Sequence, residues 1–199
     1  MAEIAVYPET LPVGSKGHHA SGWWGMLALI ATEAALFAYL LFSYFYLASH
    51  AYPPWPPNGP PHLRISVPGT IILFIGSVTM WWGERGMKKG KSGQLMIGIA
   101  LTLVLGTAFI VLQGFEWAGQ PFTLTTSVYS SLYFTITGFH ILHVLVGLVM
   151  LIVLLVWTAL GYFDAERHSA ASIGVIYWHF VTAVWFAVFF TFYIAPRLG

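Results

Sequence analysis

The chain has 199 residues, of which 58% are hydrophobic and 8% are charged, and its formal net charge is +1. A soluble domain carries about 25% charged residues, so this composition excludes an ordinary water-soluble protein and indicates that lipid surrounds most of the chain. The near-neutral charge offers no attraction for nucleic acid, and the lack of cysteine excludes disulfides, thiolate metal sites and thioether-linked haem.

A polar arm and five apolar stretches define the predicted organisation. Residues 1–21 contain acidic, basic and proline positions without an apolar core, so they predict a flexible arm and not a signal peptide. The apolar stretches cover about residues 22–47, 66–87, 94–117, 127–160 and 172–195. Each exceeds the roughly 20 residues that cross a bilayer as a helix, and helices satisfy their own backbone hydrogen bonds in lipid. The sequence therefore predicts an all-α integral membrane bundle of five transmembrane helices over residues 22–199.

The connection after the first predicted helix is rich in proline. Residues 52–61 contain six prolines around Trp55 and predict a stiff, polyproline-like loop. Trp55, Pro56 and Pro57 form a candidate docking surface for another protein, and a simple connector is the alternative. On the second helix, Gly69, Gly76 and Gly83 recur every seven residues, a pattern that predicts close approach of a neighbouring helix.

Basic residues gather between the second and third stretches. Arg85, Lys88, Lys89 and Lys91 lie in or beside this connection, and the positive-inside rule places such a loop in the cytoplasm. With an odd number of spans, the N-terminus is expected in the cytoplasm and the C-terminus on the outer side, periplasmic or extracellular.

The candidate site residues are ionisable side chains inside the predicted helices. Glu33 lies within the first helix, Glu116 ends the third, His140 and His143 lie on the fourth, and His179 lies on the fifth. Charge in hydrocarbon is costly, so such groups are expected to face protein and to have partners. Because Glu33 and His143 reach a similar depth, we expect these two to pair.

Three interpretations of these residues stay open. In the first, they stabilise the bundle. In the second, they act together with lipid headgroups or in proton transfer. In the third, they bind haem, with His179 as one ligand and either His140 or His143 as the other. A spacing of three puts His140 and His143 on neighbouring parts of one face, so this pair cannot bind both faces of a haem. We expect no catalytic residue and no metal ligand in this chain. Glu116 either caps the end of its helix or has a functional role.

Several short motifs follow one another in a characteristic order. They are Thr-Glu-Ala-Ala-Leu-Phe at 32–37, Trp-Pro-Pro-Asn-Gly at 55–59, Leu-Gln-Gly-Phe-Glu-Trp at 112–117, Thr-Gly-Phe-His-Ile-Leu-His-Val at 137–144 and Tyr-Trp-His-Phe-Val at 177–181. In this order and spacing the chain resembles subunit III of the haem–copper oxidases, in particular the five-helix bacterial form of cytochrome c oxidase subunit III. The resemblance covers about residues 22–193.

The resemblance implies an accessory subunit of an aa3-type cytochrome c oxidase in the plasma (inner) membrane of a bacterium. Such a subunit has no redox centre, stabilises subunit I and supports proton uptake during oxygen reduction and proton pumping. Implied partners are subunit I with its haems and copper, subunit II, small subunits and membrane lipids, including bound phospholipid. Glu33 matches the family's intramembrane carboxylate, and His140, His143 and His179 match its helix histidines.

The chain also departs from the family pattern. Seven-helix members have two additional N-terminal helices, and this chain is expected to begin at their third. Thr182 stands where many relatives are acidic and Ser172 stands near such a position, which weakens a proton-linked role for the fifth helix. Glu33 and Trp55 favour cytochrome c over quinol as the electron donor. The alternatives are subunit III of a quinol oxidase, a relative linked to nitric oxide reductase, and a stand-alone membrane cytochrome b. A transporter is disfavoured, because no inverted repeat is evident.

Overall fold

The computed structural model describes residues 21–51, 55–57, 59–165 and 167–198. The predicted polar arm lies outside the described residues, apart from Ser21. The helices are α1 (Ser21–His50), α2 (Leu63–Met87), α3 (Ser92–Ala118), α4 (Val128–Ala159) and α5 (Ser169–Phe189), and α5 continues into the π-helical η1 (Phe190–Ile194) and the 3-10 turn η2 (Ala195–Arg197).

The helices form an all-α membrane bundle, as predicted. Each of the five, with α5 counted through its extension to Arg197, is long and apolar enough to cross a membrane. Within the described ranges there is no strand. The chain is therefore a multi-pass membrane protein.

The helix ends differ from the predicted bounds for local reasons. Ser127 precedes α4 as its N-cap, and its hydroxyl accepts from the backbone N–H of Ser130 at 3.1 Å, as capping serines commonly do. The predicted fifth helix to residue 195 is α-helical only to Phe189, and its last turns are π-helical and then 3-10. Pro196 lies within this 3-10 turn, and proline cannot donate the backbone hydrogen bond that would continue an α-helix.

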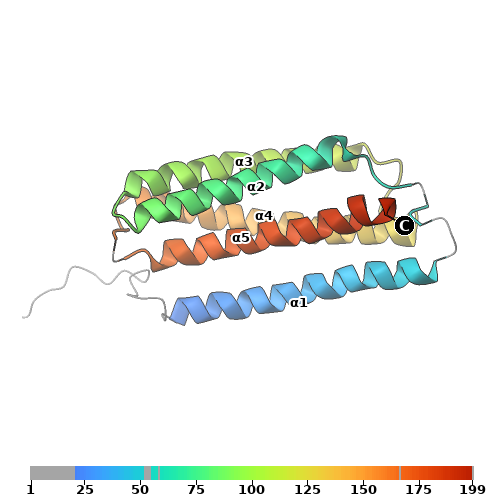
Figure 1. The fold of residues 1–199 in the computed structure, drawn as a ribbon, viewed down its shortest axis with the longest axis horizontal. Helices are drawn as coiled ribbons and strands as arrows, with labels where there is room; N and C mark the ends of the chain where they lie inside the picture. The colour runs from blue at the N-terminus through green and yellow to red at the C-terminus, as the bar shows by residue number, and fades with distance from the viewer. Residues whose placement is uncertain (1–20, 52–54, 58, 166, 199) are drawn as a thin grey trace, which may run out of the picture.

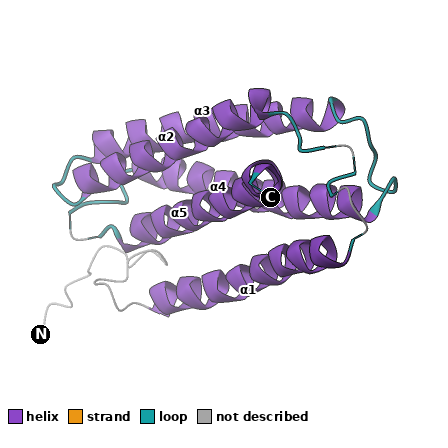
Figure 2. Cartoon of the chain, turned by 45° about the vertical axis from the view of Figure 1, so that its right-hand side comes forward, coloured by secondary structure: helices purple, strands orange, loops and turns teal. Residues whose placement is uncertain are grey.

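The bundle has three layers. In Figure 1, α4 and α5 lie between α1 on one side and the α2–α3 hairpin on the other, and Figure 2 shows the same order after rotation. The turn from α2 to α3 passes through Gly90, whose φ of 75° suits glycine. This turn puts α2 and α3 in antiparallel contact along their length.

Glycine sets the close approach of α2 and α3. A Cβ atom built on Gly98 of α3 would lie 2.8 Å from the carbonyl oxygen of Thr79 and 3.0 Å from the Cα atom of Gly83. Gly106 gives similar room to Trp178 of α5, since a Cβ there would lie 2.7 Å from the indole ring. The small-residue spacing on the second predicted helix therefore marks a true helix contact.

An aromatic cluster closes the end of the bundle where α1 finishes and α2 begins. The ring of Tyr44 lies 4.9 Å from that of Phe192 and 5.7 Å from that of Trp55, and Trp55 lies 5.4 Å from Tyr129. Trp55 thus packs onto the chain's own bundle. Of the three candidate docking residues Pro57 is the exposed one, and a docking role for this loop stays a prediction.

Candidate functional site

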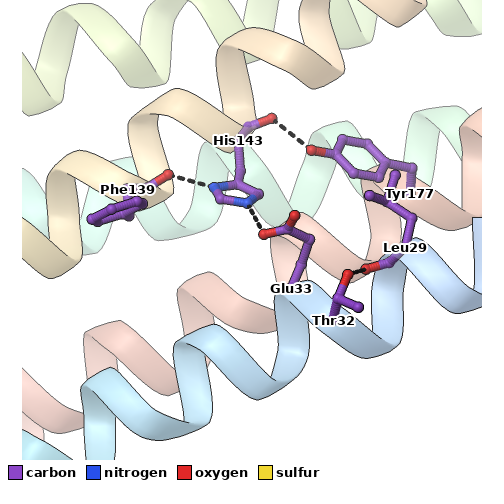
Figure 3. A network of polar contacts seen from close by, with 6 residues as sticks. All are labelled: Leu29, Thr32, Glu33, Phe139, His143 and Tyr177. Atoms are coloured by element: carbon purple, nitrogen blue, oxygen red, sulfur yellow. Dashed lines mark hydrogen bonds and ion pairs between the residues drawn. The ribbon is translucent and has the colours of Figure 1, made fainter.

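Glu33 of α1 and His143 of α4 form a hydrogen-bonded pair midway along the bundle. Glu33 Oε2 lies 2.7 Å from His143 Nε2, and Figure 3 shows the two side chains meeting across the gap between their helices. The pairing predicted from their depths is confirmed. It joins the outer helix α1 to the middle layer.

The second ring nitrogen of His143 fixes where protons can lie. His143 Nδ1 is 2.6 Å from the carbonyl oxygen of Phe139, and a carbonyl only accepts, so Nδ1 carries a proton. Nε2 then either accepts from a protonated Glu33 or, in an imidazolium, donates to a carboxylate. In both states one proton lies between Nε2 and Oε2.

The pair lies at the edge of the protein interior. The Glu33 side chain is 26% exposed and that of His143 is 11% exposed. Phe37 covers one side, with its ring 5.0 Å from the imidazole, and the Tyr177 hydroxyl lies 3.5 Å from the His143 carbonyl oxygen. Within this chain, protein therefore covers one side of Glu33 and leaves the other side partly exposed.

His140 lies in a different environment from its neighbour on α4. It is fully buried, its ring lies 4.8 Å from that of Trp185, and its Nε2 donates to the carbonyl oxygen of Val181 on α5 at 3.1 Å. Its Nδ1 has no partner among the described groups, and in the neutral ring this nitrogen has no proton. The expectation of a shared face is only partly met, because His140 contacts α5 while His143 contacts α1.

His179 belongs to a third set of contacts, between α5 and α2. Its Nδ1 lies 2.5 Å from the hydroxyl oxygen of Ser77. Two further bonds join the same helices: Trp185 Nε1 donates to Thr70 at 2.9 Å, and Ser172 donates to Glu84 at 2.6 Å. We call these three hydrogen bonds the α2–α5 seam.

The sequence carries a signal for this seam. Thr70, Ser77 and Glu84 recur every seven residues, one position after the glycines that face α3. Ser172 stands near a position of the fifth helix at which many relatives are expected to have an acidic residue. In this chain Glu84 of α2 places a carboxylate beside Ser172. Because α2 supplies the carboxylate, the residue at position 172 does not by itself argue against proton-linked chemistry there. Glu84 also pairs with Lys88 at 2.9 Å.

Glu116 does not cap α3. Its side chain is 4% exposed and points inward, where Oε1 accepts from the hydroxyl of Tyr193 and from the amide of Gln120, both at 3.2 Å. The Gly119 N–H caps the helix instead, by donating to the carbonyl oxygen of Phe115 at 3.0 Å. The capping interpretation was wrong because a carboxylate and a helix C-terminal carbonyl are both acceptors.

The ionisable residues thus form separate helix–helix contacts and not one reaction centre. No group of three or more His, Cys, Asp or Glu side chains that could bind a metal occurs among the residues with described positions. His140, His143 and His179 each have a ring nitrogen engaged by a different partner. Hydrogen-bonded polar groups of this kind stabilise contacts between helices in lipid.

Comparison with known proteins gives a consistent result. A family model described as "Cytochrome c oxidase subunit III" matches residues 15–196. A protein of Gadus morhua named "Cytochrome c oxidase subunit 3" is 34% identical over 191 residues, which cover 89% of this chain and 73% of that protein. Proteins of the same name from Scyliorhinus canicula and Drosophila melanogaster are each 32% identical, covering 89% and 85% of this chain and 73% and 68% of the relatives.

Proposed function

Because the chain belongs to the cytochrome c oxidase subunit III family, we propose that it is the accessory subunit III of an aa3-type, proton-pumping cytochrome c oxidase. In this role it stabilises subunit I and supports proton uptake, and it has no redox centre of its own. Haems and copper belong to the partner subunits, with subunit I as the main contact and subunit II, small subunits and membrane lipids as further ones.

The observation that supports the accessory role is that the ionisable side chains within the helices join neighbouring helices. The Glu33–His143 pair joins α1 to α4, His140 joins α4 to α5, and His179 joins α5 to α2. Such contacts make the chain a rigid membrane support, which is the property an accessory subunit needs.

The distribution of charge supports an orientation. Lys88, Lys89 and Lys91 are exposed at the α2–α3 turn, and the positive-inside rule assigns that end to the cytoplasm. The aromatic cluster then lies on the outer side, with the C-terminus. We place the chain in the plasma membrane of a bacterium, the setting of the five-helix form that it resembles, and membrane fractionation of the source cells tests this location.

Affinity purification of the full-length chain from its own membranes tests the assignment. The expected result is copurification of a haem–copper subunit I and a subunit II, and a complex that oxidises reduced cytochrome c. A complex that oxidises quinol and not cytochrome c would favour the quinol-oxidase alternative. Isolation of the chain without any haem–copper partner would overturn the proposal.

A further inference from the structure

One ring nitrogen of His179 is open at the outer surface of the bundle. Its Nδ1 lies 2.5 Å from the hydroxyl oxygen of Ser77, but its Nε2 takes part in none of the described hydrogen bonds. Nε2 is also not among the fully buried atoms without a partner, so this half-buried side chain exposes it. His179 lies midway between Ser169 and Phe189, the two ends of α5. Nε2 is therefore about 15 Å from either end, deep in the hydrocarbon layer.

Ser77 makes this open nitrogen a hydrogen-bond donor. The serine hydroxyl has no other acceptor among the described residues, so it donates to His179 Nδ1. In a neutral imidazole only one nitrogen carries the proton, and here that nitrogen is Nε2. Lipid tails contain no hydrogen-bond acceptor, so they leave this N–H group unsatisfied.

Other polar side chains at the membrane surface are satisfied within their own helices. The hydroxyls of Thr32, Ser43 and Thr107 donate to backbone carbonyl oxygens three or four residues earlier, at 2.7, 2.9 and 2.8 Å. His179 uses Nδ1, the nitrogen nearer to the backbone, for Ser77. Its Nε2 therefore needs an acceptor from outside the chain.

Small and aromatic side chains surround this donor. Ala183 and Ala187 follow His179 at intervals of four residues, so they lie on the same side of α5, and both are exposed. The exposed rings of Phe74 and Phe186 lie 6.2 Å apart and meet across the junction of α2 and α5. We call these five residues the α2–α5 face. Its small residues allow close approach of another membrane helix.

We propose that the α2–α5 face binds a transmembrane helix of another oxidase subunit, and that this helix places an acceptor oxygen opposite His179 Nε2. A hydroxyl, a side-chain amide carbonyl or a carboxyl group supplies such an oxygen, and hydrogen bonds of this kind join membrane helices. The proposal rests on the proposed function, because it takes the partner helix from the oxidase complex.

Site-specific cross-linking in native membranes tests the contact. The photoreactive amino acid p-benzoylphenylalanine replaces Ala183 in the full-length chain. In the control it replaces Val104, which is 67% exposed midway along α3. After irradiation the complex is purified, and cross-linked peptides are identified by mass spectrometry. We expect a cross-link to a transmembrane segment of a partner subunit from position 183 and not from position 104.

Two conservative variants separate the outward donor from the contact with Ser77. The amide nitrogen of asparagine can take the place of Nδ1, and that of glutamine can take the place of Nε2. His179→Asn therefore keeps a group near Ser77 and loses the outward donor, whereas His179→Gln keeps the outward donor. We expect His179→Asn to weaken association with the partner subunit about fivefold on dilution in detergent, the effect of one interhelical hydrogen bond. His179→Gln is expected to associate like the parent.

Several results would overturn the proposal. They are equal cross-linking from the two positions, a cross-link from position 183 only to a small molecule such as a quinone, and association of His179→Asn as tight as that of His179→Gln. Each of these leaves the proposed function intact if the partner subunits are present in the purified complex. Absence of a haem–copper subunit from the parent preparation would overturn both, and it is seen before any irradiation.

Discussion

Replacing Glu33 by alanine is expected to loosen the bundle by a predictable amount. The change removes the partner that lies 2.7 Å from His143 Nε2. The His143 side chain is 11% exposed, so water from outside reaches this nitrogen poorly. A buried polar group left without its partner costs about 1–3 kcal/mol. For a chain of 150–250 residues, each kcal/mol corresponds to a melting temperature change of about 2–4 °C.

Thermal unfolding of the purified complex in detergent measures this loss. The Glu33→Ala variant is expected to melt about 2–12 °C lower than the parent, while its initial turnover stays close to that of the parent. The double variant Glu33→Leu/His143→Phe is the control, because it removes both partners and leaves no unsatisfied ring nitrogen. Replacing both partners by apolar groups can be nearly neutral, so this variant is expected to recover most of the lost stability.

Two results would refute the reasoning. If Glu33→Ala abolishes turnover at once while the assembly and its melting temperature are unchanged, the carboxylate acts in the chemistry and not as a helix contact. If the double variant is no more stable than Glu33→Ala, the unpaired imidazole is not the source of the loss.

Three further changes test other contacts, each by thermal unfolding against the parent. Gly98→Ala is expected to lower the free energy of unfolding by about 1–3 kcal/mol through overpacking against α2. The control is Gly93→Ala on the same helix, where the added Cβ atom meets nothing within 4 Å. Equal stability of the two variants would contradict the described contact. Ser77→Ala, which removes the partner of the histidine in the α2–α5 seam, is expected to cost about 1 kcal/mol. Ser43→Ala is the control and is expected to cost less, because among the described residues its hydroxyl donates only to the carbonyl oxygen of Tyr39 in its own helix, at 2.9 Å. Tyr193→Phe removes one of two donors to the buried carboxylate of α3 and is expected to cost about 1–3 kcal/mol, and a neutral effect would show that this carboxylate does not depend on the tyrosine.

The fold was predictable because the membrane leaves few choices. A long apolar segment in lipid has to pair its own backbone groups, and this requirement gives the helices and their approximate ends. The Glu33–His143 pair followed from the same reasoning, since two polar groups at similar depth in adjacent helices gain by meeting. The glycine repeat on α2 likewise identified a real contact with α3.

The rotation of each helix about its axis was harder to predict. Membrane helices are apolar on almost every side, so hydropathy does not show which face meets which neighbour. Whether Ser77 and Glu84 face α5 depends on that rotation, and so does the inward direction of Glu116. The seven-residue spacing of Thr70, Ser77 and Glu84 was the available signal, because a repeat of this length marks one face of a helix in contact with another.

The central claim is that this chain supports a haem–copper enzyme without binding a pigment itself. A reduced-minus-oxidised absorbance spectrum of the full-length chain, expressed alone and purified in detergent, tests it most directly. We predict no haem band from the isolated chain and a strong band when it is purified with its partner subunits. A haem band in the isolated chain that disappears on replacing His140, His143 or His179 would contradict the account and identify a membrane cytochrome b.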